Sequence, residues 1–119
     1  MIAWIVQGLL GAAFLAAGGM KLVKTREALL AEGARMAWVE DFSDTALRGI
    51  GVVEVLGAIG VVLPQLTGIL PVLTPVAAAG LVLTMLGAAA THVRRGEYPA
   101  VVPNLVLGGL ALAVIWLRL

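Results

Sequence analysis

Four long apolar runs govern what this chain can fold into. They occupy approximately residues 2–20, 45–63, 75–93 and 99–118. Each is about 17–20 residues long, which is close to the length at which a helix crosses the ~30 Å hydrocarbon core of a bilayer. The runs lack the alternation of apolar and polar residues that membrane barrels need, so helices are the expected structure. The sequence therefore predicts an all-α membrane protein, with one four-transmembrane-helix bundle over residues 1–119.

The composition supports the same class. Hydrophobic residues make up 61% of the chain and charged residues only 13%, whereas a soluble domain has about 25% charged residues. A soluble chain of 119 residues could not hide so much apolar surface from water. The net charge of +1 and the short basic clusters argue against nucleic acid as a partner. The chain has no cysteine, which excludes thiol chemistry and thiolate-bound metals, and no other metal-binding motif is present.

The first connection, residues 21–44, is the only segment with a partly soluble character. Residues 25–37 mix leucine and methionine with arginine and glutamate. This mixture predicts a short amphipathic helix at the inner membrane interface, followed by a turn over residues 38–44. Ser43 or Asp44 is expected to cap the second span. The connection is then either a solvated connector or a lid over a cavity in the inner leaflet.

Basic residues lie almost entirely on one side of the predicted bundle. The first and third connections, with their flanks, hold Lys21, Lys24, Arg26, Arg35, Arg48, Arg94 and Arg95. Only Arg118 and the N-terminal amine lie on the other side. Positive charge marks the cytoplasmic side of membrane proteins. We therefore expect a multi-pass protein of the inner (plasma) membrane, with both termini outside and residues 21–44 cytoplasmic.

The N-terminal span is expected to be a retained helix. A secretory signal peptide carries its positive charge before the apolar run, whereas here Lys21 and Lys24 follow it. The small residues at 16–19 still leave cleavage as an alternative.

Proline and small residues indicate where the later spans begin and how the spans pack. Thr74 is expected to be the N-cap of the third span, with Pro75 at its first helical position. The fourth span is expected to start between Pro99 and Pro103. Glycine and alanine recur in all four spans and allow close helix approach in lipid. A compact bundle follows, although some of these faces would equally suit a dimer.

Glu54 is the most informative polar residue, because it lies inside an apolar span. A carboxyl group in hydrocarbon costs roughly 2.5–3.5 kcal/mol on insertion scales, so it needs a partner, a cavity or a function. Counted from Arg48, Glu54 lies about 9 Å inside the inner boundary at the rise of an α-helix. Lys21, His92 and Asn104 lie on the other three spans, also in the inner half. We therefore predict that Glu54 contacts at least one of them.

Two interpretations of these four residues remain open. A structural polar core would pair Glu54 with Lys21 or His92, and Asn104 would bridge helices; such hydrogen bonds are worth about 0.6 kcal/mol on average. A functional site would be an inner-leaflet cavity that binds a small amphiphile by its polar head. In that case Lys21, Glu54, His92 and Asn104 would be the ligand-binding residues.

Several motifs share their order and spacing with one family of membrane proteins. They are residues 18–22, 38–42, 51–64, 92–97 and 104–105. Through them the chain resembles the DoxX-like family of small bacterial four-helix membrane proteins. The resemblance implies no single activity: wider relatives look like membrane components of quinone-linked sulfur oxidation and oxidative-stress complexes, and a distant animal relative resembles a receptor-assembly chaperone. It does place Lys21, Glu54, His92 and Asn104 at recurrent motif positions of the family.

Three functions of different classes fit these features. The first is a redox accessory subunit that binds a quinone or another lipophilic molecule, with a membrane redox protein as partner. The second is a non-catalytic assembly or partner-binding protein that uses its glycine and alanine faces. The third is a subunit of a small homo-oligomeric transporter, since one four-helix chain lacks the inverted repeats of a complete transporter. The sequence names no reaction and leaves open whether the protein is an enzyme.

Haem is disfavoured as a cofactor of a single chain. His92 is the only histidine. Met85 lies on the same span and cannot reach the opposite face of an iron bound by His92.

Overall fold

The computed structural model describes the backbone of residues 1–119 and every side chain except that of Arg35. Its long helices are α1 (Ile2–Val23), α3 (Asp44–Gly60), α5 (Leu73–Arg94) and α6 (Tyr98–Arg118). Its short ones are α2 (Arg26–Leu30), the 3-10 helix η1 (Ala34–Asp41) and α4 (Leu63–Thr67). Four segments are long and apolar enough to cross a membrane, α3 and α4 together forming the second. The predicted all-α bundle of four membrane-spanning helices is confirmed.

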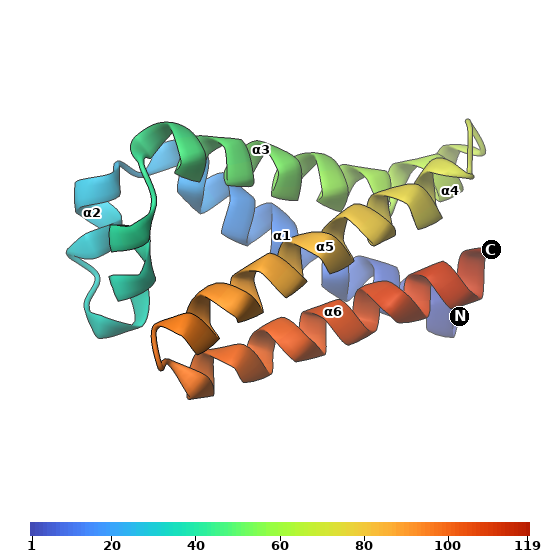
Figure 1. The fold of residues 1–119 in the computed structure, drawn as a ribbon. Helices are drawn as coiled ribbons and strands as arrows, with labels where there is room; N and C mark the ends of the chain where they lie inside the picture. The colour runs from blue at the N-terminus through green and yellow to red at the C-terminus, as the bar shows by residue number, and fades with distance from the viewer.

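The long helices form two pairs that are closed into a ring. α1 packs against α3 and α5 against α6, while contacts between α3 and α5 and between α1 and α6 join the pairs. Both termini lie at one end of the bundle, with α4, and the α2–η1 connection lies at the opposite end (Figure 1). α3 and α5 lie close together near α4 and diverge toward the connection (Figure 1). The bundle is therefore narrow at the end with the termini and wider at the end with the connection.

Glycines set the two close helix contacts that define this shape. A Cβ atom on Gly18 of α1 would lie only 2.7 Å from the carbonyl oxygen of Gly51 in α3. A Cβ atom on Gly57 of α3 would clash with Leu81 in α5 and would lie 2.9 Å from its Cγ. Small residues permit such approaches, and close packing is the main attraction between helices in lipid. The Gly18–Gly51 contact lies near the connection, whereas the Gly57–Leu81 contact lies near α4. Toward the connection, α3 therefore diverges from α5 but remains packed against α1.

Two separate apolar cores stabilise the structure. The larger core joins the four long helices at the end with the termini and contains Leu10, Phe14, Ala58, Val61, Ala78, Leu81, Met85, Ala111 and Val114. The smaller core belongs to the connection and the start of α3 and contains Leu29, Met36, Val39 and Leu47. The connection thus folds onto the bundle around apolar residues of its own.

Gln7 ties three helices together at the end with the termini. Its side chain is completely buried, and its Nε2 donates to the carbonyl oxygen of Val61 at 2.7 Å. Arg118 Nε in turn donates to Gln7 Oε1 at 2.8 Å. Val61 lies just after α3, where helical carbonyls lose their own partners. Gln7, which interrupts the first span in the sequence, therefore has a structural role.

The start of α5 differs from the expectation. Thr74 is not its N-cap: the helix begins at Leu73, Val72 is the cap residue, and no side chain caps the helix. The amides of Leu73 and Thr74 donate to the carbonyls of Leu70 and Pro71, so a preceding turn already satisfies these amides. Thr74 consequently lies in the first turn and is fully buried. α6 likewise starts at Tyr98, just before the expected interval.

The first connection also differs in detail. One amphipathic helix over residues 25–37 was expected, but the structure has α2 and η1, separated near Gly33, which has a positive φ of 109°. The expected turn over residues 38–44 is wrong in part, because η1 extends to Asp41. Ser43 caps α3 as predicted, with its hydroxyl oxygen accepting from Ala46 N at 3.1 Å. The Arg35 side chain lies outside the described part of the chain, and the location of this connection at a membrane interface stays a prediction.

Candidate functional site

A cavity of about 1110 Å³ lies between the two apolar cores. Phe14 and Met85 of the larger core and Met36 of the smaller core all line it. The four residues singled out in the sequence also line it, one from each long helix: Lys21, Glu54, His92 and Asn104. Most of the remaining lining is apolar, with aromatic and methionine side chains prominent. The structure therefore places the four polar residues around one common space.

The Lys21–Glu54 ion pair follows from the close contact between α1 and α3. A Cβ atom on Gly18 would lie 2.9 Å from Glu54 Cβ, and one on Gly51 would lie 3.1 Å from Lys21 Cβ. Each glycine thus leaves room for the base of a charged side chain on the other helix. Helical side chains point back toward the N-terminus of their own helix, and Lys21 Nζ accordingly donates to the carbonyl of Ala17 at 3.3 Å. This direction brings the ammonium group to Glu54.

The two charged groups are close and almost completely shielded from solvent. Lys21 Nζ lies 2.8 Å from Glu54 Oε1, with 9% and 4% of the side chains exposed. The contact is an ion pair without the geometry of a regular hydrogen bond. Glu54 Oε1 has no hydrogen-bond donor in the described part of the chain. Nζ also lies 5.6 Å from the centre of the Trp38 ring, within the range of a cation–π contact. The predicted contact between Glu54 and one of the other three residues is confirmed for Lys21.

His92 lines the cavity but is paired with a different carboxylate. Its Nδ1 lies 3.0 Å from Glu97 Oε1. Its ring meets the edge of Trp38, with a centre-to-centre distance of 6.2 Å and an angle of 74°. Trp38 therefore contacts both His92 and the ammonium of Lys21 through its ring.

Asn104 contributes an unused hydrogen-bonding group. Its Nδ2 is buried and, in the orientation that the amide has in this structure, finds no acceptor in the described part of the chain. Buried polar groups are nearly always paired with protein or water. The hydroxyls of Thr84 and Thr91, which also line the cavity, donate to the carbonyls of Gly80 and Gly87 in their own helix. Asn104 therefore presents a buried amide nitrogen without an acceptor beside the cavity.

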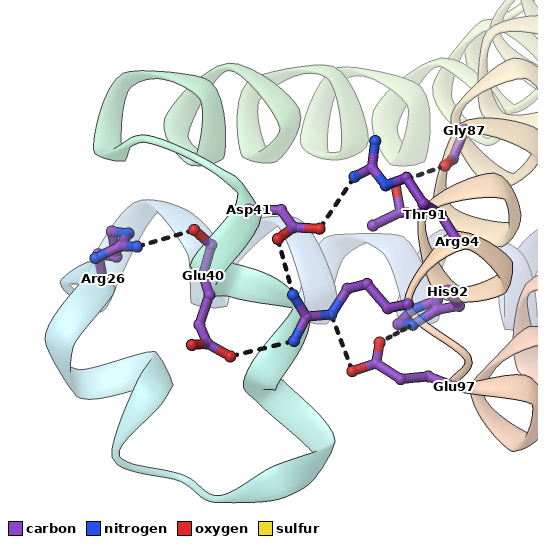
Figure 2. A network of polar contacts seen from close by, with 9 residues as sticks. Arg26, Glu40, Asp41, Gly87, Thr91, His92, Arg94 and Glu97 are labelled. Atoms are coloured by element: carbon purple, nitrogen blue, oxygen red, sulfur yellow. Dashed lines mark hydrogen bonds and ion pairs between the residues drawn. The ribbon is translucent and has the colours of Figure 1, made fainter.

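Charged residues attach the connection to the end of α5 (Figure 2). Arg95 donates to Asp41 Oδ1 at 2.8 Å, to Glu40 Oε1 at 3.1 Å and to Glu97 Oε2 at 3.0 Å. Arg94 donates to Asp41 Oδ2 at 3.0 Å. Cations at the C-terminus of a helix also interact favourably with its dipole. We call these contacts, together with the His92–Glu97 pair, the latch.

The latch changes the ionisation of its own members. The hydrogen bond with His92 is the main cause that holds the pKa of Glu97 below its ordinary value, and Arg95 adds to the effect. The hydrogen bond with Glu97 likewise raises the pKa of Arg95. The latch was not predicted from the sequence. The sequence nevertheless contains a signal for it. Glu40 and Asp41 are adjacent acids, Arg94 and Arg95 are adjacent bases, and the predicted topology puts both pairs on the same side of the membrane.

The family comparison agrees with the sequence and the fold. The model of the DoxX-like family matches residues 5–114. The chain belongs to the DoxX-like family. No curated protein and no solved structure matches it. The match includes most of all four long helices and all four polar cavity residues, so this DoxX-like chain is a multi-pass integral membrane protein.

No group of three or more His, Asp or Glu side chains in the described part of this DoxX-like chain is placed to hold a metal ion. The site instead offers a buried ion pair, an unpaired amide and an apolar enclosure. Chemically, that arrangement suits the binding of a small molecule with a polar head and an apolar body.

Proposed function

We propose that this DoxX-like protein binds a small lipophilic amphiphile in the cavity between its helix pairs. The observation that carries the proposal is the arrangement of four polar residues, one from each long helix, around a space that is otherwise largely apolar. Ligand sites typically have volumes of about 300–1,000 Å³ and combine an apolar lining with a few placed polar groups. The cavity, at about 1110 Å³, is slightly larger than this range and has the same kind of lining.

The side chains suggest the chemistry of the ligand. The Asn104 amide lacks an acceptor, so the head group should bring one, such as a carbonyl oxygen. The ammonium of Lys21 is beside the same space and would also attract an acceptor. Methionine sulfur and aromatic rings pack well against flat, polarisable groups, and Met20, Met36 and Trp38 line the cavity.

A quinone has these properties, and we propose a redox accessory role as the leading case. Quinones present carbonyl acceptors on a flat ring, and they take up protons when they are reduced. Glu54 and His92 both line the cavity and can hold or release protons beside a bound head group. The electrons would come from a membrane redox partner, because the chain's own residues supply only binding and proton exchange in this proposal.

A non-catalytic assembly role is the second candidate. Gly109 has no atom within 4 Å of the place that a Cβ would occupy, and with Leu112, Ala113 and Trp116 it lines a hollow on α6. Small residues four apart favour helix association in membranes. This face would suit a second copy or another membrane protein, including the neighbouring subunit of a small transporter.

We also propose the orientation and the membrane. Seven of the eight basic side chains are at or beside the connections between the first and second and between the third and fourth spans. The positive-inside rule supports an inner-membrane protein with both termini outside. The cavity and the latch would then be in the cytoplasmic half.

Mass spectrometry of small molecules that co-purify with the gently solubilised protein tests the proposal. A stoichiometric quinone supports the redox role, and another lipophilic amphiphile supports binding without that role. A stoichiometric protein partner with no small molecule supports the assembly role and contradicts ligand binding.

A further inference from the structure

The cavity has an opening between α3 and α5 in the half of the bundle near the connection. Ala46, Gly49 and Val53 of α3 and Gly87 of α5 line the cavity, yet all four are exposed on the surface of the chain. A Cβ atom on Gly49 or on Gly87 would meet nothing within 4 Å. These four residues, which we call the rim, therefore border open space rather than a packed contact.

The two helices that form the rim are held together elsewhere. The Gly57–Leu81 contact lies toward α4, and a Cβ atom on Gly60 would likewise lie 2.6 Å from Ala77 Cβ. Figure 1 shows α3 and α5 separating from there toward the connection. The opening thus results from the divergence of these two helices. It reaches from the inner boundary of the second span, where Ala46 and Gly49 lie beside Arg48, into the two candidate spans at Val53 and Gly87.

The end of the cavity near the connection is covered. Met36, Trp38 and Phe42 line the cavity from the connection, and the latch attaches this segment to α5 through Arg95 and Asp41. Entry from the aqueous side would require these charged contacts to break, whereas entry through the rim requires no contact to break.

We propose that the cavity is loaded sideways from the bilayer, through the opening between α3 and α5. The ligand is then a molecule dissolved in the membrane rather than a water-soluble metabolite. Its acceptor head reaches Asn104 and Lys21, and its apolar tail leaves between Gly49 and Gly87 into lipid. This inference rests on the proposed ligand-binding function and adds the route and the class of the ligand.

Fluorescence quenching of Trp38 can follow loading directly. The chain has three tryptophans, so Trp4→Phe/Trp116→Phe leaves Trp38 as the reporter in the cavity. The protein is placed in phosphatidylcholine vesicles and mixed rapidly with 2-methyl-1,4-naphthoquinone, a lipophilic quencher. Trp4→Phe/Trp38→Phe provides the reference, because Trp116 is 83% exposed and reports quenching from the lipid phase. A saturable phase seen only with Trp38 measures entry into the cavity.

Leucine substitutions at the rim separate the routes. Gly49→Leu and Gly87→Leu should slow the saturable phase severalfold, because each puts a bulky side chain in the opening. Gly8→Leu and Gly80→Leu are matched controls, since both sites have open space within 4 Å but do not line the cavity; their rates should equal the parent rate. Thermal melts close to the parent would show that the rim variants fold.

Three results would overturn the inference. Parent-like rates in both rim variants would exclude this opening as the route. Faster loading in Arg95→Gln, with no effect at the rim, would assign the route to the aqueous side. The absence of a saturable Trp38 phase in the parent itself would contradict the proposed quinone site, and the inference with it.

Discussion

Lys21 Nζ lies 2.8 Å from Glu54 Oε1, in a pair whose side chains are both more than nine-tenths buried. Removing two charges from water is costly, and mutual attraction repays the cost only when the geometry is favourable. Here the pair forms where Gly18 and Gly51 bring α1 and α3 together, and it lines the cavity. The pair therefore couples the packing of two helices to the candidate site.

Breaking this pair on one side should be more damaging than replacing it completely. Glu54→Leu leaves the Lys21 ammonium buried without a counter-charge, so we expect the free energy of unfolding to fall by about 3–5 kcal/mol. Lys21→Met/Glu54→Leu exchanges both charges for apolar groups and should recover most of that loss. Unfolding in detergent is measured for wild type, for the single variants Lys21→Met and Glu54→Leu, and for the double variant. A double variant that loses the sum of the two single losses would contradict this account of the pair.

The contact between α1 and α3 should be sensitive to a single methyl group. Gly18→Ala would place a Cβ 2.7 Å from the Gly51 carbonyl oxygen, and we expect destabilisation of about 1–3 kcal/mol, as for other overpacked sites. Gly19→Ala is the control, because its Cβ would meet nothing within 4 Å. Thermal melts of the two variants make the comparison. Equal stability would mean that the helices are not in tight contact at Gly18.

The latch should weaken in acid. His92 and Arg95 lower the pKa of Glu97, so its contribution to stability is complete above the ordinary pKa, about 4.3. That contribution is lost as the pH falls through the lowered pKa of the folded protein. The protection of residues 34–42 against hydrogen exchange, corrected for the intrinsic pH dependence of amide exchange, should therefore fall in this acidic range. Glu97→Gln should already exchange faster at neutral pH and should lose part of the acid response.

Exposed Glu27 provides the control for that experiment, because it lies on α2 outside the latch. Glu27→Gln should keep the acid response of the parent protein. If Glu27→Gln and Glu97→Gln change exchange equally, the latch does not control the connection.

The long-range architecture could be predicted from the sequence because bilayer length and hydropathy constrain it strongly. The apolar runs predicted the four spans, and counting helical rise from Arg48 put Glu54 at a depth shared by Lys21 on another helix. The contact of that pair was predictable for this reason. The pairing of His92 with Glu97 was not, because depth does not specify the direction in which a side chain turns.

Local details depended on contacts that the sequence pattern does not contain. Thr74 looked like an N-cap, but the turn before α5 satisfies the first amides with backbone carbonyls. The connection was expected to be one helix, yet the positive φ of Gly33 separates two. Gln7, a polar residue within the first apolar run, donates to the carbonyl oxygen of Val61, 54 positions away in the chain. Each difference arises from a backbone or tertiary contact rather than from a local preference.

Topology can be tested with single cysteines, because the chain has none of its own. Ile69, which is 69% exposed, lies after α4, and Thr45 is an exposed residue near the start of α3. In intact cells a membrane-impermeant maleimide should label Ile69→Cys, and it should label Thr45→Cys only after permeabilisation. Labelling of Thr45→Cys from outside would reverse the proposed orientation.

Asn104 offers the most direct test of the cavity as a ligand site. Its Nδ2 is buried without a partner, so replacing the amide with an apolar side chain removes an unpaired polar group and should not destabilise the protein. If Asn104 serves only the fold, Asn104→Leu should leave the amount of bound small molecule unchanged. If it serves a ligand, the variant should fold normally and bind less of it. We therefore expect Asn104→Leu to lower the ligand occupancy without lowering the stability of the protein.

The decisive measurement is the amount of lipophilic small molecule, per protein, that co-purifies with wild type and with Asn104→Leu. The Gly8→Leu variant serves as a control outside the cavity. We predict one species in near-stoichiometric amount in wild type and in Gly8→Leu, and its depletion in Asn104→Leu. With the ligand removed from both proteins, the melting temperature of Asn104→Leu should equal or exceed that of wild type, because a bound ligand would itself stabilise wild type. The same amount in all three proteins, or no specific species in wild type, would contradict a ligand-binding cavity.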